Sequence, residues 1–229
     1  MKNLENKIVW ITGASSGIGL AVAKLFNERG SVVILSARKK ETLEKTQKTL
    51  PNPEKSFVLP LDLTKPEQFV MATKQVIDRY NDIDVLVNNG GISQRSLASE
   101  TPIDIDRAIM EVNYFGHVGL TKAVLPFMHT QKEAYIITIS SLSGKFGFFQ
   151  RSAYAASKHA LQGFFESLRL EEEKNNIKVL LLLDIGGSMD DHIELCSQLF
   201  SAAKYEFKHL DFYYFHNCVY EVLWKKLMF

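Results

Sequence analysis

Short apolar runs alternate with longer amphipathic stretches along most of the chain. The apolar runs are rich in valine, isoleucine and leucine and are bounded by glycine, proline or polar residues, which is typical of buried strands. The pattern predicts six strands, at residues 7–12, 31–36, 56–61, 83–87, 134–140 and 177–183. The stretches between them have helical periodicity, and we expect helices at residues 20–29, 41–50, 67–80, about 104–130 and about 153–175.

This alternation predicts an α/β fold over residues 1–183: a Rossmann-type, doubly wound parallel sheet in three α/β/α layers, with right-handed crossovers. No internal repeat or low-complexity linker interrupts it. The atypical tail, residues 184–229, patterns as a helix at 190–207 and a strand at 212–215. We expect this tail to complete the sheet.

With 229 residues, 46% of them hydrophobic, the chain is long enough for one large globular domain. A net charge of +1 gives no reason to expect nucleic acid or an anionic membrane as a partner. Cys196 and Cys218 lack the spacing of a disulfide framework or a zinc site. The N-terminus is polar, and the apolar run at 179–183 is too short to span a bilayer. We therefore expect a cytoplasmic protein with no membrane anchor in this chain.

A glycine-rich turn, Gly13-Ala14-Ser15-Ser16-Gly17-Ile18-Gly19, follows the first strand and leads into a helix. Such a turn presents backbone N–H groups and the positive end of a helix to a phosphate, and a Cβ atom would block the phosphate's approach. The spacing Gly-x-x-x-Gly-x-Gly differs from the commoner Gly-x-Gly-x-x-Gly fingerprint. The turn indicates a nucleotide site, and a turn that merely joins two elements is the alternative. The expected cofactor contacts are Gly13, Ser15, Ser16, Gly17, Ile18 and Gly19.

The residues after the second strand indicate the type of cofactor. In dinucleotide folds an acidic residue here binds the ribose hydroxyls, whereas arginine accommodates a 2′-phosphate. This chain has Arg38 followed by two lysines, and its first carboxylate is Glu41. NADP(H) is therefore predicted in preference to NAD; the alternative is a basic helix start on a wet surface.

Two further strand ends carry candidate ligand-binding residues. After the third strand, Asp62, next to Leu63, would accept a hydrogen bond from an adenine amino group or cap the helix after Pro66. After the fourth strand, Asn89 and Gly90 lie in a run of amides and small residues. Because ligands bind at the carboxyl ends of such strands, we include Asp62, Leu63, Asn89 and Gly90 among the cofactor contacts.

Tyr154 and Lys158 are four residues apart in a stretch that begins as a helix, with Ser152 as its cap and alanines after it. On a helix they share one face, and their side chains can meet. A free tyrosine has a pKa near ~10, and an adjacent ammonium favours the phenolate and lowers that pKa. The pair indicates a general acid/base that needs no metal; a solvated helix face is the alternative.

The motifs of this chain resemble, in order and spacing, those of the short-chain dehydrogenase/reductases over residues 7–183. They are Thr12-Gly13-x-x-x-Gly17-Ile18-Gly19, Asn88-Asn89-Gly90-Gly91, Asn113, Ser141 and Tyr154-x-x-x-Lys158. The run from Asn88 to Ser96 is most similar to the dehydrogenase/reductase member 7 branch. Gly90 is a departure, since the family motif has alanine there.

The resemblance implies an oxidoreductase that interconverts a small-molecule carbonyl and alcohol with NADP(H). It does not decide between a monomer and a homo-oligomer. Tyr154 would exchange a proton with the substrate oxygen, and Lys158 would lower its pKa and bind the nicotinamide ribose. Ser141 would hydrogen-bond the same oxygen, and Asn113 would hold a water that joins Lys158 to solvent. The alternative for Ser141 is a turn serine, for Asn113 a buried amide with its hydrogen bonds satisfied, and for Lys158 a surface charge.

After residue 183 the family expects a Pro-Gly turn and a threonine near the cofactor amide. This chain has Asp184-Ile185-Gly186-Gly187-Ser188-Met189 instead, and no threonine follows. Residues 180–224 resemble the opening of a von Willebrand factor A-type domain, in which such a turn binds Mg²⁺ with the help of later loops. We expect a glycine-rich turn here and no metal site. The chain thus resembles a chimera whose tail would impair turnover, and the rival hypotheses are a nucleotide-binding protein without turnover and a metal-dependent interaction module.

Overall fold

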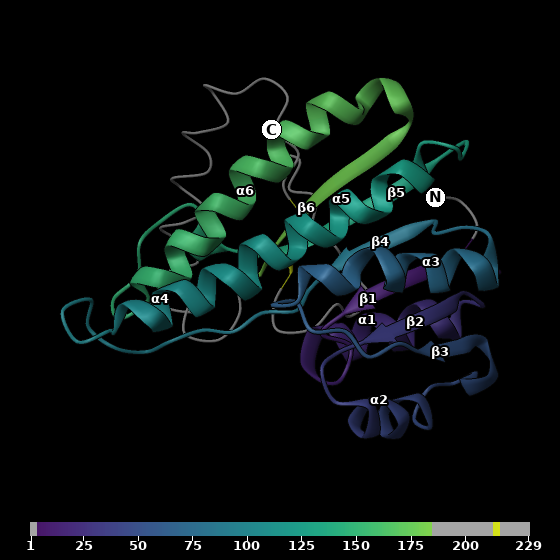
Figure 1. The fold of residues 1–229 in the computed structure, drawn as a ribbon, viewed down its shortest axis with the longest axis horizontal. Helices are drawn as coiled ribbons and strands as arrows, with labels where there is room; N and C mark the ends of the chain where they lie inside the picture. The colour runs from purple at the N-terminus through teal and green to yellow at the C-terminus, as the bar shows by residue number, and fades with distance from the viewer. Residues whose placement is uncertain (1–3, 185–212, 216–229) are drawn as a thin grey trace.

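Seven parallel strands form one sheet in the computed structural model, which describes residues 4–184 and 213–215 (Figure 1). Their order is β3-β2-β1-β4-β5-β6-β7. The strands are β1 (Ile8–Thr12), β2 (Val32–Ser36), β3 (Ser56–Val58), β4 (Val85–Asn88), β5 (Ala134–Ser141), β6 (Ile177–Asp184) and β7 (Tyr213–Phe215). All six strands predicted up to residue 183 are present, and the predicted Rossmann-type fold is confirmed.

Helices cover both faces of the sheet. They are α1 (Gly17–Glu28), α2 (Lys40–Gln47), α3 (Phe69–Tyr80), α4 (Ile103–Met110), α5 (Gly116–Met128) and α6 (Ser152–Glu172). Short 3₁₀ turns lie at Pro53–Lys55, Pro66–Gln68, Leu142–Gly144 and Glu173–Asn175. Helices α1 and α2 pack with one set of strand side chains, and α3, α5 and α6 pack with the opposite set (Figure 1). The central strands are therefore buried on both faces and read as continuous apolar runs.

The third strand and the first helix differ from their predicted bounds. β3 ends at Val58 rather than at residue 61, because Pro60 has no N–H to donate to a ladder. Leu59 and Leu61 still donate backbone hydrogen bonds to the segment at the end of β2. α1 begins at Gly17, three residues earlier than predicted, so the last glycines of the turn are already helical.

The helix predicted at about 104–130 is interrupted at its middle by a π-helical turn, Glu111–Phe115. Asn113, inside that turn, is fully buried and bonded to Ile92 rather than turned to solvent. An extra residue in a helical turn is a common device for aiming a functional side chain. α4 and α5 are thus two helices on either side of a turn that sets the direction of Asn113.

The tail contributes a short strand to the described part of the chain. β7 pairs in parallel with β6 through Leu182–Tyr213, Leu183–Tyr214 and Asp184–Phe215. The predicted strand at 212–215 thus forms at Tyr213–Phe215. The predicted helix at 190–207 and the remainder of the tail lie outside the described residues. Among the described helices, none is long and apolar enough to cross a membrane.

Candidate functional site

The order in which successive strands are added to the sheet reverses at β1, which lies between β2 and β4. In open parallel sheets, ligands bind outside the carboxyl ends of the strands at such a point. A cavity of about 360 Å³ lies there. Its lining residues are Thr12, Gly13, Ser15, Ser16, Ser36, Ala37, Arg38, Leu61, Asp62, Leu63, Asn89, Gly90, Gly91, Ile92 and Val112.

The glycine turn on one wall of the cavity leaves no room for side chains. Gly13 has φ +64°, and a Cβ atom there would lie 2.8 Å from Gly90 Cα. A Cβ atom on Gly19 would lie 2.3 Å from the Gly13 carbonyl oxygen. The N-cap of α1, Ser16, makes no side-chain hydrogen bond to the first turn of that helix. This close backbone packing at an uncapped helix start fits the pyrophosphate of a dinucleotide.

Thr12 links the glycine turn after β1 to the loop after β4, and both line the cavity. Its hydroxyl accepts the N–H of Asn89 at 2.9 Å and of Gly90 at 3.1 Å and donates to the Val87 carbonyl. The Asn89 amide in turn donates to the carbonyls of Thr12 and Gly13. The loop after β4 is therefore fixed against the glycine turn, and an alanine methyl in place of Gly90 would lie 2.8 Å from Leu63 Cδ1.

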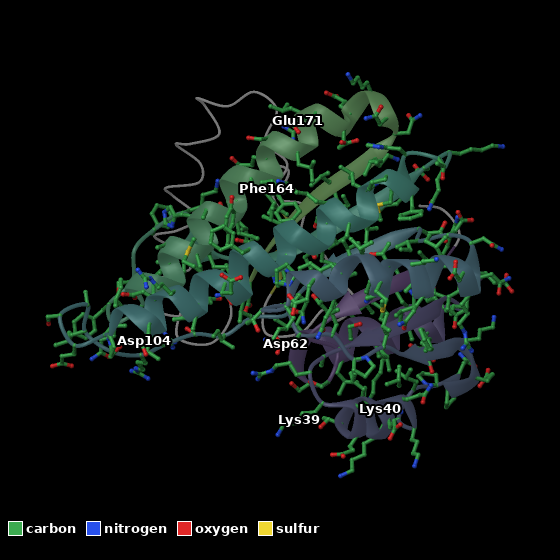
Figure 2. All side chains as sticks on the ribbon, viewed as in Figure 1. Lys39, Lys40, Asp62, Asp104, Phe164 and Glu171 are labelled. Atoms are coloured by element: carbon green, nitrogen blue, oxygen red, sulfur yellow. The ribbon has the colours of Figure 1, made fainter. Side chains whose placement is uncertain are left out.

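The part of the cavity beyond β2 and β3 carries one arginine and one aspartate. Arg38 lines it from the end of β2, and Lys39 and Lys40 beyond it are exposed at the start of α2 (Figure 2). Asp62 accepts hydrogen bonds from the Thr64 N–H and hydroxyl. Partial burial works against its charge, but these bonds and the nearby Arg38 hold the pKa of Asp62 below its usual value. Asp62 therefore forms a local turn with Thr64, and the prediction that it caps the helix after Pro66 is not what the structure shows.

Eight of the predicted cofactor contacts line this cavity: Gly13, Ser15, Ser16, Arg38, Asp62, Leu63, Asn89 and Gly90. Gly17, Ile18, Gly19, Tyr154 and Lys158 do not. The sequence analysis did not include seven other lining residues among the cofactor contacts: Thr12, Ser36, Ala37, Leu61, Gly91, Ile92 and Val112. Ser36 ends a predicted strand and Leu61 precedes Asp62, so strand-end position was the available signal for both.

Tyr154 and Lys158 meet on one face of α6, as predicted. Lys158 Nζ lies 5.7 Å from the centre of the Tyr154 ring. The lysine is only 4% exposed, and its ammonium donates to the Ile139 carbonyl at 2.9 Å, so it is not a surface charge. Ser141, at the end of β5, is 8% exposed. Its side chain lies close enough to Tyr154 to lower the pKa of that phenol, and it accepts the Ser143 N–H.

The pKa of Tyr154 moves in the direction opposite to the prediction. Burial raises it and nearby Asp184 adds to this, against the effects of the Ser141 side chain and the charge of Arg151. Burial also lowers the pKa of Lys158 to about 8, although Asp184 works against that change. Burial, which disfavours the charged phenolate, is the largest cause of the Tyr154 shift, and Lys158 is not among its causes.

Asn113 connects the cavity to the helix that carries Tyr154. Its amide accepts the Ile92 N–H and donates to the Ile92 carbonyl, each at 2.9 Å. It also donates to Ser157 Oγ at 3.0 Å, and that hydroxyl donates to the Tyr154 carbonyl. The water that Asn113 is predicted to hold stays a prediction.

His117, one turn farther along α5, was not a predicted site residue. It is fully buried, and its Nε2 lies 2.5 Å from the Gly90 carbonyl oxygen. Burial and the charge of Lys158 lower its pKa to about 3, despite the hydrogen bond to Gly90. The neutral ring therefore donates from Nε2 to the loop after β4. Its spacing of four residues from Asn113 was the only available signal.

At the ends of α6 and β6 the structure corrects one prediction and gives the position of one residue that the sequence could not place. Ser152 does not cap α6; it is the first helical residue, and Arg151 is the N-cap. Asp184 ends β6 directly beside Ser141 in the register of β5 and β6. Because side chains of paired residues point to the same face, the Asp184 carboxylate lies on the same face of the sheet as the Ser141 hydroxyl.

Comparison with known proteins identifies the family. A family model described as short chain dehydrogenase matches residues 7–183. The chain belongs to the short-chain dehydrogenase/reductase family. The match ends at residue 183, where the atypical tail begins, and includes the first residues of the segment 180–224 that was predicted to be von Willebrand factor A-like. The comparisons do not support that prediction, and most of the segment lies outside the described residues.

Several relatives belong to the predicted member 7 branch. Dehydrogenase/reductase SDR family protein 7-like of Anopheles gambiae is 49% identical, over 79% of this chain and 59% of that protein. SDR family member 7B of Mus musculus is 43% identical, over 78% and 57%, and member 7 of Homo sapiens is 46% identical, over 73% and 51%. The chain thus spans little more than half the length of these relatives.

Solved structures agree with the fold. A short-chain dehydrogenase from Streptomyces avermitilis superposes with a TM-score of 0.75 and 36% identity, over 79% of this chain and 65% of that one. A metagenomic short-chain oxidoreductase in complex with NADP has a TM-score of 0.74 and 28% identity, over 86% and 90%.

Proposed function

We propose that the chain is an NADP(H)-dependent oxidoreductase that interconverts a carbonyl and an alcohol, with Tyr154 as general acid/base. One observation carries this proposal. Tyr154, close to Ser141 and beside buried Lys158, lies at the same carboxyl end of the strands as the cavity next to the glycine turn. A proton donor and a dinucleotide-shaped site at one end of the strands are what carbonyl reduction requires.

Each polar side chain would have one task. Tyr154 gives its phenolic proton to the carbonyl oxygen during reduction and takes a proton from the alcohol during oxidation. Ser141 holds the same oxygen by a hydrogen bond. Lys158, fixed by the Ile139 carbonyl, supplies positive charge beside the phenolate and a donor to the nicotinamide ribose. Bound NADP(H) supplies the hydride.

Arg38 supports NADP(H) over NAD(H). It lines the cavity at the end of β2, where an acidic residue would bind the ribose hydroxyls. A guanidinium offers a planar set of donors that suits a 2′-phosphate. The related oxidoreductase that was solved with NADP, 28% identical to this chain, agrees with this assignment.

Asp184 favours a second candidate, a nucleotide-binding protein that turns over weakly or not at all. Its carboxylate raises the pKa of Tyr154, which is already raised by burial. Neither the proline nor the threonine that the family resemblance predicts follows β6. Small misplacements of reacting groups can cost ~10²-fold in rate, so the altered tail would impair turnover while cofactor affinity survives.

Titration with NADPH and NADH, followed by a screen of ketones and secondary alcohols, tests these candidates. The proposal predicts tighter binding of NADPH and measurable reduction of at least one carbonyl. Binding without turnover across the screen would favour the second candidate, and a chain that binds neither cofactor would contradict both. Replacing residues 184–229 with a reductase tail should then raise turnover without a large change in NADPH affinity.

A further inference from the structure

The first turn of α6 is capped by a residue from another part of the chain. Its N-cap, Arg151, makes no side-chain hydrogen bond to the turn. Gln94, in the loop after β4, accepts the Tyr154 N–H at 3.2 Å and approaches Ser152 Oγ at 3.4 Å with its own NH₂ group. The Tyr154 N–H is one of the donors that every helix start leaves without an internal partner. Gln94 therefore acts where an N-cap side chain usually does.

The identity of the atoms in this contact follows from the donors around it. A backbone N–H can only donate, so the amide oxygen of Gln94 must face Tyr154. The NH₂ group then faces Ser152, whose hydroxyl can accept. Only one orientation of the Gln94 amide satisfies both neighbours.

Gln94 is itself held in place from two directions. Its residue is only 9% exposed. Arg151 Nη1 donates to the Gln94 carbonyl at 2.7 Å and to Ser93 Oγ at 2.7 Å. Two residues earlier, both backbone groups of Ile92 are bonded to the Asn113 amide. The side chain thus has little freedom left to lose when it forms the cap.

We propose that Gln94 is a positioning residue, whose side-chain cap fixes the turn that carries Tyr154 against the loop that borders the cofactor cavity. Ile92 lines that cavity, and Gln94 links the same loop to Tyr154 across 60 residues of sequence. The distance between the phenol and a substrate held in the cavity then depends on this link. The kinetic consequence rests on the function proposed above, whereas the cap does not.

Three variants separate the cap from other roles of this side chain. Gln94→Met keeps the length of the side chain and removes the acceptor. Gln94→Glu keeps an oxygen for the Tyr154 N–H, and its charge suits a helix N-terminus. Gln150→Met is the matched control, because Gln150 lies in the segment just before α6 and no hydrogen bond of its side chain is found among the described residues.

Amide hydrogen exchange of the Tyr154 N–H measures the cap in the protein without cofactor. Exchange should become about tenfold faster in Gln94→Met, the scale of a lost helix cap, and should stay within about twofold of the wild type in Gln94→Glu and Gln150→Met. Unchanged exchange in Gln94→Met would overturn the proposal.

Kinetics measure the positioning. In Gln94→Met, kcat should fall ~10-fold or more, while the Kd for NADPH stays within about twofold. Faster exchange with an unchanged kcat would show that the cap is merely structural. A higher KM with an unchanged kcat would make Gln94 a substrate contact. Either result overturns the positioning role.

If the wild type does not turn over, the ¹³Cζ resonance of Tyr154, identified by its loss in Tyr154→Phe, decides instead. It should move in Gln94→Met but not in Gln150→Met, and an unmoved resonance in Gln94→Met would contradict the proposal.

Discussion

The site has two halves that depend on different structural features: the cofactor cavity, called the nucleotide half, and the cluster around Tyr154, called the catalytic half. The nucleotide half depends on the absence of side chains, because a Cβ atom on Gly13 or Gly19 would collide with neighbouring backbone. The catalytic half depends on buried polar side chains, with Asn113 and Ser157 fully buried and Lys158 only 4% exposed. The first half should therefore be damaged by added atoms and the second by removed ones.

The largest expected effect comes from the removal of one atom in the catalytic half. Tyr154→Phe keeps the ring and deletes the hydroxyl, so carbonyl reduction should fall by ~10²-fold or more, as for loss of a general acid. NADPH affinity, measured by fluorescence, should stay within about twofold. Tyr80→Phe, on α3, is the control. Near-normal turnover in Tyr154→Phe would exclude Tyr154 as the proton donor.

The converse change adds one methyl group to the nucleotide half. Gly19→Ala would place Cβ 2.3 Å from the Gly13 carbonyl oxygen, so the turn must open. We expect a loss of ~3 kcal/mol in the free energy of unfolding and weaker NADPH binding. Gly163→Ala is the matched control, because the Cβ atom there meets no atom within 4 Å and should stabilise α6 by ~0.5–1 kcal/mol. Equal urea midpoints for the two variants would contradict the comparison.

Arg38 is a place where cofactor binding in the nucleotide half is expected to depend on a side chain. Arg38→Ala should weaken NADPH binding by ~1.5–3 kcal/mol, the scale of charged hydrogen bonds, and NADH binding much less. Lys39→Ala, which removes a neighbouring exposed charge outside the cavity lining, controls for the general field. If Arg38→Ala weakened both cofactors equally, the arginine would be only a surface charge.

His117 gives the catalytic half a sensitivity to acid. Its pKa is about 3 in the folded protein and near ~6.5 in an unfolded chain. Between these values the unfolded state binds more protons, so stability falls as the pH drops below ~6.5 and the loss from this residue reaches about 2 kcal/mol at pH 5. His117→Gln keeps a donor for Gly90 and should remove that part of the loss.

Urea unfolding at pH 7.5 and pH 5.0 measures this effect. The difference between the two pH values should shrink in His117→Gln and stay unchanged in His159→Gln, which removes an exposed imidazole from α6. An equal pH difference in the wild type and His117→Gln would show that the buried imidazole is not the source of the acid sensitivity.

The sequence predicted the nucleotide half better than the catalytic half, for a physical reason. The glycine turn and the apolar strands are local patterns, and their geometry follows from neighbouring residues. The cap from Gln94 joins residues 60 apart, and the contact of His117 with Gly90 joins residues 27 apart. Motif spacing placed Tyr154 and Lys158 together, but it could not predict the burial that raises one pKa and lowers the other. The predicted Ser152 cap was wrong for the same reason, since the actual cap comes from a distant loop.

The π turn at Glu111–Phe115 also fixes the rotational phase of a long helical segment. Each residue of an α-helix turns the chain by about 100°, so the extra residue in this turn rotates α5 relative to α4 by that angle. With it, Asn113 reaches Ile92 while Leu120 and Val124 face the core. Deletion of one residue from the turn would restore a regular helix. Asn113 could then not reach Ile92 while Leu120 and Val124 face the core. Insertions and deletions in this segment should therefore be tolerated far less well than substitutions of its exposed side chains.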